Sequence, residues 1–130
     1  MISDKGTEKT ATGGRRDIQE RTFAFALGIV NLCRHLDGKS GAGRILALQL
    51  LRSGTSVGAN VEEAQAGQSR ADFISKYSIA LKEIREARYW LRLMAESKVM
   101  DPNLINPLIQ EAFELSNILG AIVSRTRRRS

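Results

Sequence analysis

The chain has 130 residues, a formal net charge of +6, one cysteine and an aromatic content of 5%. This length predicts a single domain with one core, and the scarcity of aromatic residues predicts that the core is aliphatic. No apolar run is long enough to span a bilayer, and the polar N-terminus lacks a signal-peptide pattern. We therefore expect a cytoplasmic protein without membrane contact. Because Cys33 is alone, an intramolecular disulfide is excluded, and we expect a small, buried apolar residue there.

The positive charge is concentrated at the two ends of the chain. Lys and Arg balance Asp and Glu over residues 17–124, whereas residues 1–16 and 125–130 carry a surplus of cations. Residues 1–16 also contain almost no apolar side chains, so we expect disorder there. The chain is thus divided into a disordered N-terminal tail over 1–16, a folded body over 17–124 and a basic tail over 125–130.

Helical periodicity predicts four helices in the body, over about 17–36, 43–66, 69–97 and from Asp101 to about Ser124. The third helix has an unbroken heptad seam, formed by Phe73, Tyr77, Ala80, Ile84, Ala87, Leu91 and Met94. The fourth could start at Asp101-Pro102 or at Asn106-Pro107, and we expect a bend or break before Pro107. Four helices with mostly short connections predict an all-α, up-down-up-down four-helix bundle.

The first two helices have features that a simple bundle core does not require. The first carries two apolar stripes, one from Phe23 to Cys33 and one from Phe25 to Leu36, which make an unusually wide apolar face. The second contains Gly54 and Gly58, and each glycine costs a helix about 1 kcal/mol relative to alanine. We expect another backbone to approach closely there, with a loop between two helices as the alternative.

A pattern in the middle of the chain carries a family resemblance. It consists of Arg-Ser-Gly-Thr-Ser-Val-Gly-Ala-Asn-Val-Glu-Glu-Ala at 52–64, Asp72-Phe73, Ser78-Ile79-Ala80-Leu81-Lys82-Glu83 and Ala87-Arg88-Tyr89-Trp90-Leu91. This order resembles the four-helix-bundle proteins encoded in intervening sequences of large-subunit ribosomal RNA genes. It is also similar, more distantly, to the accessory variability protein of diversity-generating retroelements. The resemblance covers about residues 20–125 and implies a ring-shaped homo-oligomer, typically a pentamer, with little implication for activity.

Few residues are spaced for catalysis or for metal binding. The triplet Gly38-Lys39-Ser40 is part of a phosphate-binding pattern, but Cys33 stands where that pattern needs its first glycine. The single histidine, His35, has no Cys or His at metal-ligand spacing, and no Glu is followed three residues later by His. We therefore expect no catalytic residue, no metal, no cofactor and no enzymatic activity.

Polar residues of the second and third helices are better suited to structural contacts. We expect the following residues at contacts between helices or between subunits: Asn60, Glu62, Glu63, Glu83 and Trp90. The acids would pair with cations of the third helix, such as Lys76 and Arg88. Trp90 lies outside the heptad seam, and large aromatics on the outside of a bundle often mark contact with another chain.

Two groups of basic residues are candidates for nonspecific binding of RNA or single-stranded DNA. One is a face of the third helix that includes an aromatic stacking residue: Lys82, Arg85, Tyr89 and Arg92. The other is the C-terminal tail, whose cations a ring would gather into one crown: Arg125, Arg127, Arg128 and Arg129. The alternatives are an ordinary solvated face and cations that favour a helix C-terminus.

These observations predict a non-enzymatic, homo-oligomeric interaction module with nonspecific nucleic-acid binding, and the resemblance implies that the oligomer is a pentamer. The alternative is an RNA- or DNA-binding accessory factor that serves a reverse transcriptase or a ribosomal RNA process. In that case a reverse transcriptase would be a protein partner.

Overall fold

The computed structural model describes the backbone of residues 2–67 and 69–129 and the side chains of residues 17–67 and 69–129. Its elements are α1 (Ile2–Cys33), the short 3₁₀ turn η1 (Arg34–Leu36), α2 (Ala42–Gln65), α3 (Arg70–Glu96) and α4 (Pro102–Arg128). No strand occurs among these residues, so the predicted all-α class is confirmed. None of the described helices is both long and apolar enough to cross a membrane.

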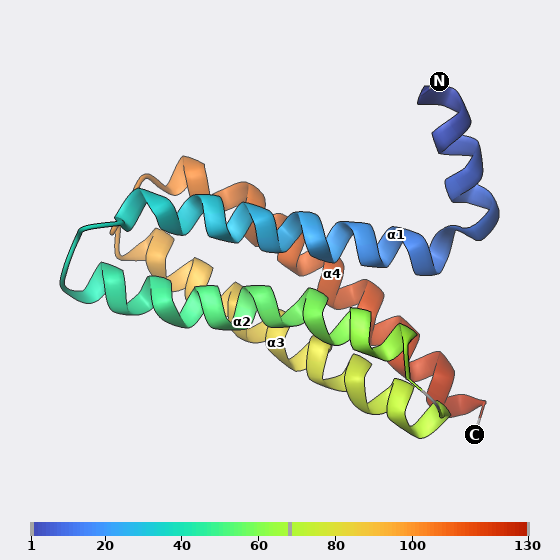
Figure 1. Cartoon of the computed structure of the whole chain (residues 1–130). Coiled ribbons are helices and arrows are strands. Elements are labelled where there is room, and N and C mark those ends of the chain that lie inside the picture. Colours follow the sequence, from blue (N-terminus) through green and yellow to red (C-terminus); the bar gives the residue numbers. More distant parts are fainter. Residues whose placement is uncertain (1, 68, 130) are drawn as a thin grey trace.

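The helices form an up-down-up-down bundle in which sequence neighbours are also spatial neighbours (Figure 1). Each helix packs on the next, and α4 returns to pack on α1, whereas diagonal pairs make no backbone contact among the described residues. The ribbons of α1 and α4 spread apart toward the C-terminal end of α4 (Figure 1). A cavity lined by Ile18 of α1 and by Ile118 and Ile122 of α4 lies at this end of the bundle.

The core contains the side chains that the predicted seams supply. In α3 the seam is buried from Tyr77 to Met94, and Phe73 at its start is half-buried. In α1 the stripe from Phe25 to Leu36 is buried, whereas Phe23 on the other stripe is 68% exposed. The largest fully buried side chains are mostly aliphatic and come from all four helices, for example Ile29, Leu50, Ile84, Leu91, Ile105 and Leu119.

Gly54 and Gly58 lie where α1 packs against α2. A β-carbon at Gly54 would be 2.9 Å from Cγ1 of Ile29, and one at Gly58 would be 3.2 Å from the backbone oxygen of Thr22. The predicted close approach of a second backbone is confirmed at Gly58, whereas at Gly54 the side chain of Ile29 occupies the space. Because α2 is continuous through both positions, the alternative of a loop there is wrong.

Two helix starts follow from local capping. The Ser69 hydroxyl accepts a hydrogen bond from the Asp72 amide at 3.0 Å, and an Asp101 oxygen accepts from the Asn103 amide at 3.0 Å. Helix α4 therefore begins with Pro102 and continues through Pro107, so the expected break is wrong. Pro107 cannot donate a hydrogen bond to the Asn103 carbonyl and its ring crowds that group, but Asn103 is exposed, so water can satisfy the oxygen.

The outer ends of α1 and α4 differ from the predicted boundaries. Helix α1 begins at Ile2 rather than at Asp17, and α4 ends at Arg128 rather than at Ser124. The C-terminal arginines are therefore part of the last helical turn, where the helix dipole favours cations. The side chains of residues 1–16 lie outside the described part, so the proposed division into a tail and a body stays a prediction.

Candidate nucleic-acid interface

One exposed face of α3 carries the predicted basic row. The side chains of Lys82, Arg85, Tyr89 and Arg92 are all exposed, Tyr89 by 56%. Tyr89 packs edge-on against the neighbouring Trp90, with ring centroids 5.1 Å apart. Among the described side chains, no ion pair joins the three cations to a carboxylate. These cations are therefore available to an anionic partner in solution.

The acids that interleave with this row in the sequence face α2 instead. Arg52 of α2 lies 3.3 Å from a Glu83 oxygen and also pairs with Glu86. Glu86 in turn accepts a hydrogen bond of 3.0 Å from the Trp90 indole nitrogen. Because one arginine from the neighbouring helix holds both carboxylates, they leave the cations of the α3 row unpaired. This arrangement weighs against an ordinary face of alternating, mutually paired charges.

The C-terminal arginines do not form one patch within the chain. Arg127 donates to the Ser78 hydroxyl at 3.4 Å and, with Lys82, lines a shallow hollow between α3 and α4. Arg128 donates to the Ser124 hydroxyl of its own helix at 2.7 Å. Arg125 and Arg129 instead line a cavity on the α1 side of α4. Only Arg127 therefore extends the α3 row.

The structure contains some of the predicted contacts between helices and replaces others. Glu63 pairs with Lys76 of α3 at 2.8 Å, as expected, and this hydrogen bond raises the pKa of Lys76. Glu83 does lie between helices, but its partner is Arg52, whose role the sequence did not indicate. Arg88, expected beside an acid, instead lies over the Phe113 ring, 5.1 Å from its centroid.

The other contact residues are local or exposed. Asn60 donates to the backbone oxygen and hydroxyl of Ser56 at 2.9 and 3.0 Å, so within the chain its amide serves its own helix. Glu62 is exposed, and Trp90 is half-buried beside Glu86. Their expected contacts with a second subunit stay predictions.

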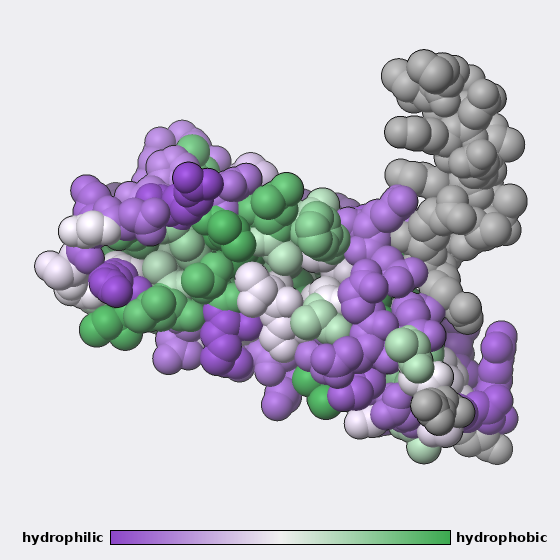
Figure 2. Space-filling view, viewed as in Figure 1, coloured by the Kyte–Doolittle hydropathy of each residue, from purple (hydrophilic) through white to green (hydrophobic). Residues whose placement is uncertain are grey.

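A second candidate surface is apolar and covers α1 and α2. We name it the α1/α2 apolar face, and its exposed members are Phe23, Leu27, Val30, Ile45 and Leu48. Figure 2 shows green side chains gathered along these two helices on the visible face of the molecule. The residues of α1 in this set are the stripe that the core leaves unused. Contiguous exposed apolar surface of this kind is typical of protein contact sites.

Comparison with protein-family models gives a match to the 23S rRNA-intervening sequence proteins over residues 15–121. The chain belongs to this family. A family relative of known structure is a protein with unknown function from the S23 ribosomal protein family of Bacteroides thetaiotaomicron. It is 35% identical with a TM-score of 0.78, covering 85% of this chain and 98% of that chain. No curated protein matches the chain.

The family membership confirms the resemblance deduced from the central sequence blocks. Because the function of the related structure is unknown, the similarity assigns no activity to this protein. The more distant similarity to the retroelement accessory protein stays a prediction. Among the described residues, no group of three or more His, Cys, Asp and Glu is placed to hold a metal ion.

Proposed function

We propose that this 23S rRNA-intervening sequence protein is a non-enzymatic, self-associating module that binds RNA or single-stranded DNA without sequence preference. The observation that carries the proposal is the α3 row, in which exposed, unpaired cations flank an exposed tyrosine. The row comprises Lys82, Arg85, Tyr89 and Arg92, and Arg127 of α4 extends it. The ring of about five subunits that the family resemblance implies is part of this proposal.

The row has the dimensions and chemistry of a single-strand track. With a rise of about 1.5 Å per residue, Lys82 and Arg92 are separated by roughly 15 Å along α3, enough for a few backbone phosphates. Phosphates would pair with the cations, and a base could stack on the Tyr89 ring. Neither interaction reads a base edge, so binding would show little sequence preference. A ring would repeat the track on every subunit and raise the overall affinity.

The test is fluorescence anisotropy with a labelled single-stranded RNA at several salt concentrations. If about three phosphates are neutralised per chain, the logarithm of the affinity should fall with the logarithm of salt with a slope of roughly −2 per track. The variant Lys82→Gln/Arg85→Gln/Arg92→Gln should bind far more weakly and with a shallower slope. Tyr89→Ala should weaken binding by about 1–3 kcal/mol and leave the slope nearly unchanged.

The matched control is Arg34→Gln/Lys39→Gln/Arg44→Gln, which removes three exposed cations near the connection between α1 and α2. It changes the net charge equally, so a loss confined to the α3 variant locates the interface. Equal loss in both triple variants would mean that net charge alone attracts the nucleic acid. Unchanged binding by the α3 variant would refute the proposed track.

A further inference from the structure

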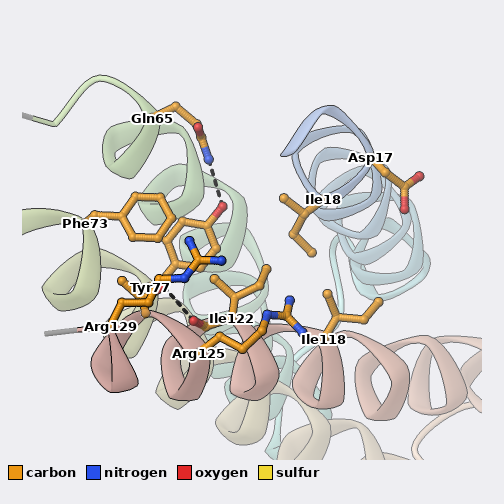
Figure 3. Close-up of a pocket in the computed structure, with 10 residues that line it drawn as sticks. Asp17, Ile18, Gln65, Phe73, Tyr77, Ile118, Ile122, Arg125 and Arg129 are labelled. Carbon is orange, nitrogen blue, oxygen red and sulfur yellow. Dashed lines mark hydrogen bonds between the residues drawn. The ribbon is translucent and has the colours of Figure 1, made fainter. Parts of the chain in front are cut away.

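A cavity of about 490 Å³ lies at the open end of the bundle, between α1 and α4. Its apolar lining comes from three helices and includes Ile18, Phe73, Ile118 and Ile122. Figure 3 shows these side chains around a common space, with Ile18 on α1 facing the isoleucines of α4. The volume is in the range of cavities that hold small organic ligands. The α3 row takes no part in this lining.

Two cations border the same cavity. Arg125 lies in the last turn of α4 and Arg129 is the helical C-cap residue four positions on, so the two lie on one side of the chain there. Among the described side chains, neither arginine is in an ion pair, and Asp17 is the only carboxylate that lines the cavity. The Arg129 carbonyl accepts a hydrogen bond of 3.0 Å from Arg70, which ties this end of the chain to α3.

The neutral polar groups of the lining already have partners. The Tyr77 hydroxyl accepts a hydrogen bond from the Gln65 amide at 2.8 Å (Figure 3). The Thr126 hydroxyl donates to the Ile122 carbonyl at 2.7 Å. A ligand would therefore find apolar contacts inside and free guanidinium groups at the border. This combination matches a molecule with an aliphatic chain and one anionic end.

We propose that the cavity binds a small amphipathic carboxylate of the medium-chain fatty-acid class. Its chain lies against Ile18, Ile118 and Ile122, and its carboxylate is held by Arg125 and Arg129. Guanidinium and carboxylate groups match in geometry and form charge-assisted hydrogen bonds. Removing the chain from water supplies the remaining affinity. This site is separate from the nucleic-acid track, because Lys82 and Arg127 line a different hollow.

Isothermal titration calorimetry of the full chain with decanoate, below its micelle concentration, tests the site. We expect saturable binding of one molecule per chain. Each methylene is worth about a fourfold change in affinity, so octanoate should bind roughly 15-fold more weakly. Decyltrimethylammonium, which has a chain of nearly the same length and the opposite charge, should not bind measurably. Absence of saturable binding, or equal binding of the cation, would overturn the proposal.

Matched arginine pairs on one helix locate the carboxylate. Arg125→Gln/Arg129→Gln should weaken decanoate binding on the order of tenfold. Arg127→Gln/Arg128→Gln removes the same charge from the same turns, outside the cavity, and should leave decanoate binding unchanged. Equal effects of the two pairs would refute the assigned site. Ile118→Trp should also block decanoate by filling the space, with circular dichroism checking that the variant is folded.

Competition with RNA separates this inference from the proposed function. The Lys82→Gln/Arg85→Gln/Arg92→Gln variant should bind decanoate normally, whether or not the chain binds RNA. Saturating RNA should not displace decanoate from the unchanged protein. Competitive displacement would assign Arg125 and Arg129 to the nucleic-acid surface and would overturn the separate site.

Discussion

Cys33 shows how one side chain reports on the contact between two helices. It is half-buried between α1 and α2, and its Sγ lies 3.6 Å from the Ala47 carbonyl oxygen. Burial raises the pKa of the thiol from 9.0 to about 11, and the charge of Asp37 adds to the rise. Both effects disfavour the thiolate, which is the reactive form of cysteine. The residue thus has the inert character expected of a packed thiol.

The thiol should react slowly with an aromatic disulfide reagent in the native protein. At pH 8 a group with a pKa of about 11 is almost entirely protonated, so we expect a rate roughly a hundredfold below that of the unfolded chain. The native rate should rise with pH up to about 11. Absorbance of the released thiol, followed with and without guanidinium, measures both rates. Equal rates in the two states would contradict the burial of Cys33.

Helix α1 approaches its two neighbouring helices, α2 and α4, in different ways. On one side of α1, Gly54 and Gly58 of α2 let the backbones come together. On the other side, Arg21 reaches Glu111 at 2.7 Å and Glu114 at 3.1 Å on α4. An ion pair between long side chains can connect two helices whose backbones are farther apart than backbones that pack against glycine. The Arg21 ion pairs therefore connect α1 to α4 across a wider gap, and the cavity lies between the same two helices.

Two alanine substitutions should have opposite effects on stability. Gly58→Ala should destabilise the protein, because overpacking of about 1–3 kcal/mol against the Thr22 backbone exceeds the gain in helix propensity. Gly120→Ala in α4 meets open space and should stabilise by up to about 1 kcal/mol. Urea denaturation at one protein concentration gives both changes. A stabilised Gly58→Ala variant would mean that the α1–α2 contact is looser than described.

At the scale of the whole molecule, the helices leave a large apolar surface uncovered among the side chains that the structure describes. On the α1/α2 apolar face, Phe23 is 68% exposed, Ile45 62% and Leu48 54%. Water contact with so many large apolar side chains is unfavourable, and burial of each would contribute about 1.5–3 kcal/mol. A ring of identical subunits would cover this face with a different face of the next subunit, through a heterologous interface that closes.

A charge placed on this face should block assembly while the fold persists. We expect multi-angle light scattering to give a closed oligomer for the unchanged chain and smaller species for Leu48→Lys. Ala121→Lys, on an exposed position of α4, adds the same charge and should assemble normally. Circular dichroism would show whether each variant keeps its helices. A monomeric unchanged chain across the micromolar range would refute self-association through this face.

The sequence by itself determined the helices and most of the core. Capping at Ser69 involves neighbours in the chain, and the α3 seam repeats within one helix, so local physics sufficed there. For the fourth helix the sequence left starts at Asp101 and Asn106 open, and the structure decided for the Asp101 cap. The close packing at Gly54 and Gly58 could also be predicted, because glycine destabilises a helix and its presence there indicates that a neighbour comes close. The family followed from the same central blocks.

Only the tertiary structure decided which surfaces face which partners. The two stripes of α1 have the same period, so the sequence could not say that Phe25 is buried and Phe23 exposed. Glu83 pairs with Arg52 because the antiparallel register of α2 and α3 brings together residues distant in the chain. The divergence of α1 from α4 likewise leaves a cavity beside Arg125 and Arg129, whereas Arg127 points to another side of the helix and lines a hollow between α3 and α4. Such outcomes depend on helix register and crossing geometry, which no local pattern encodes.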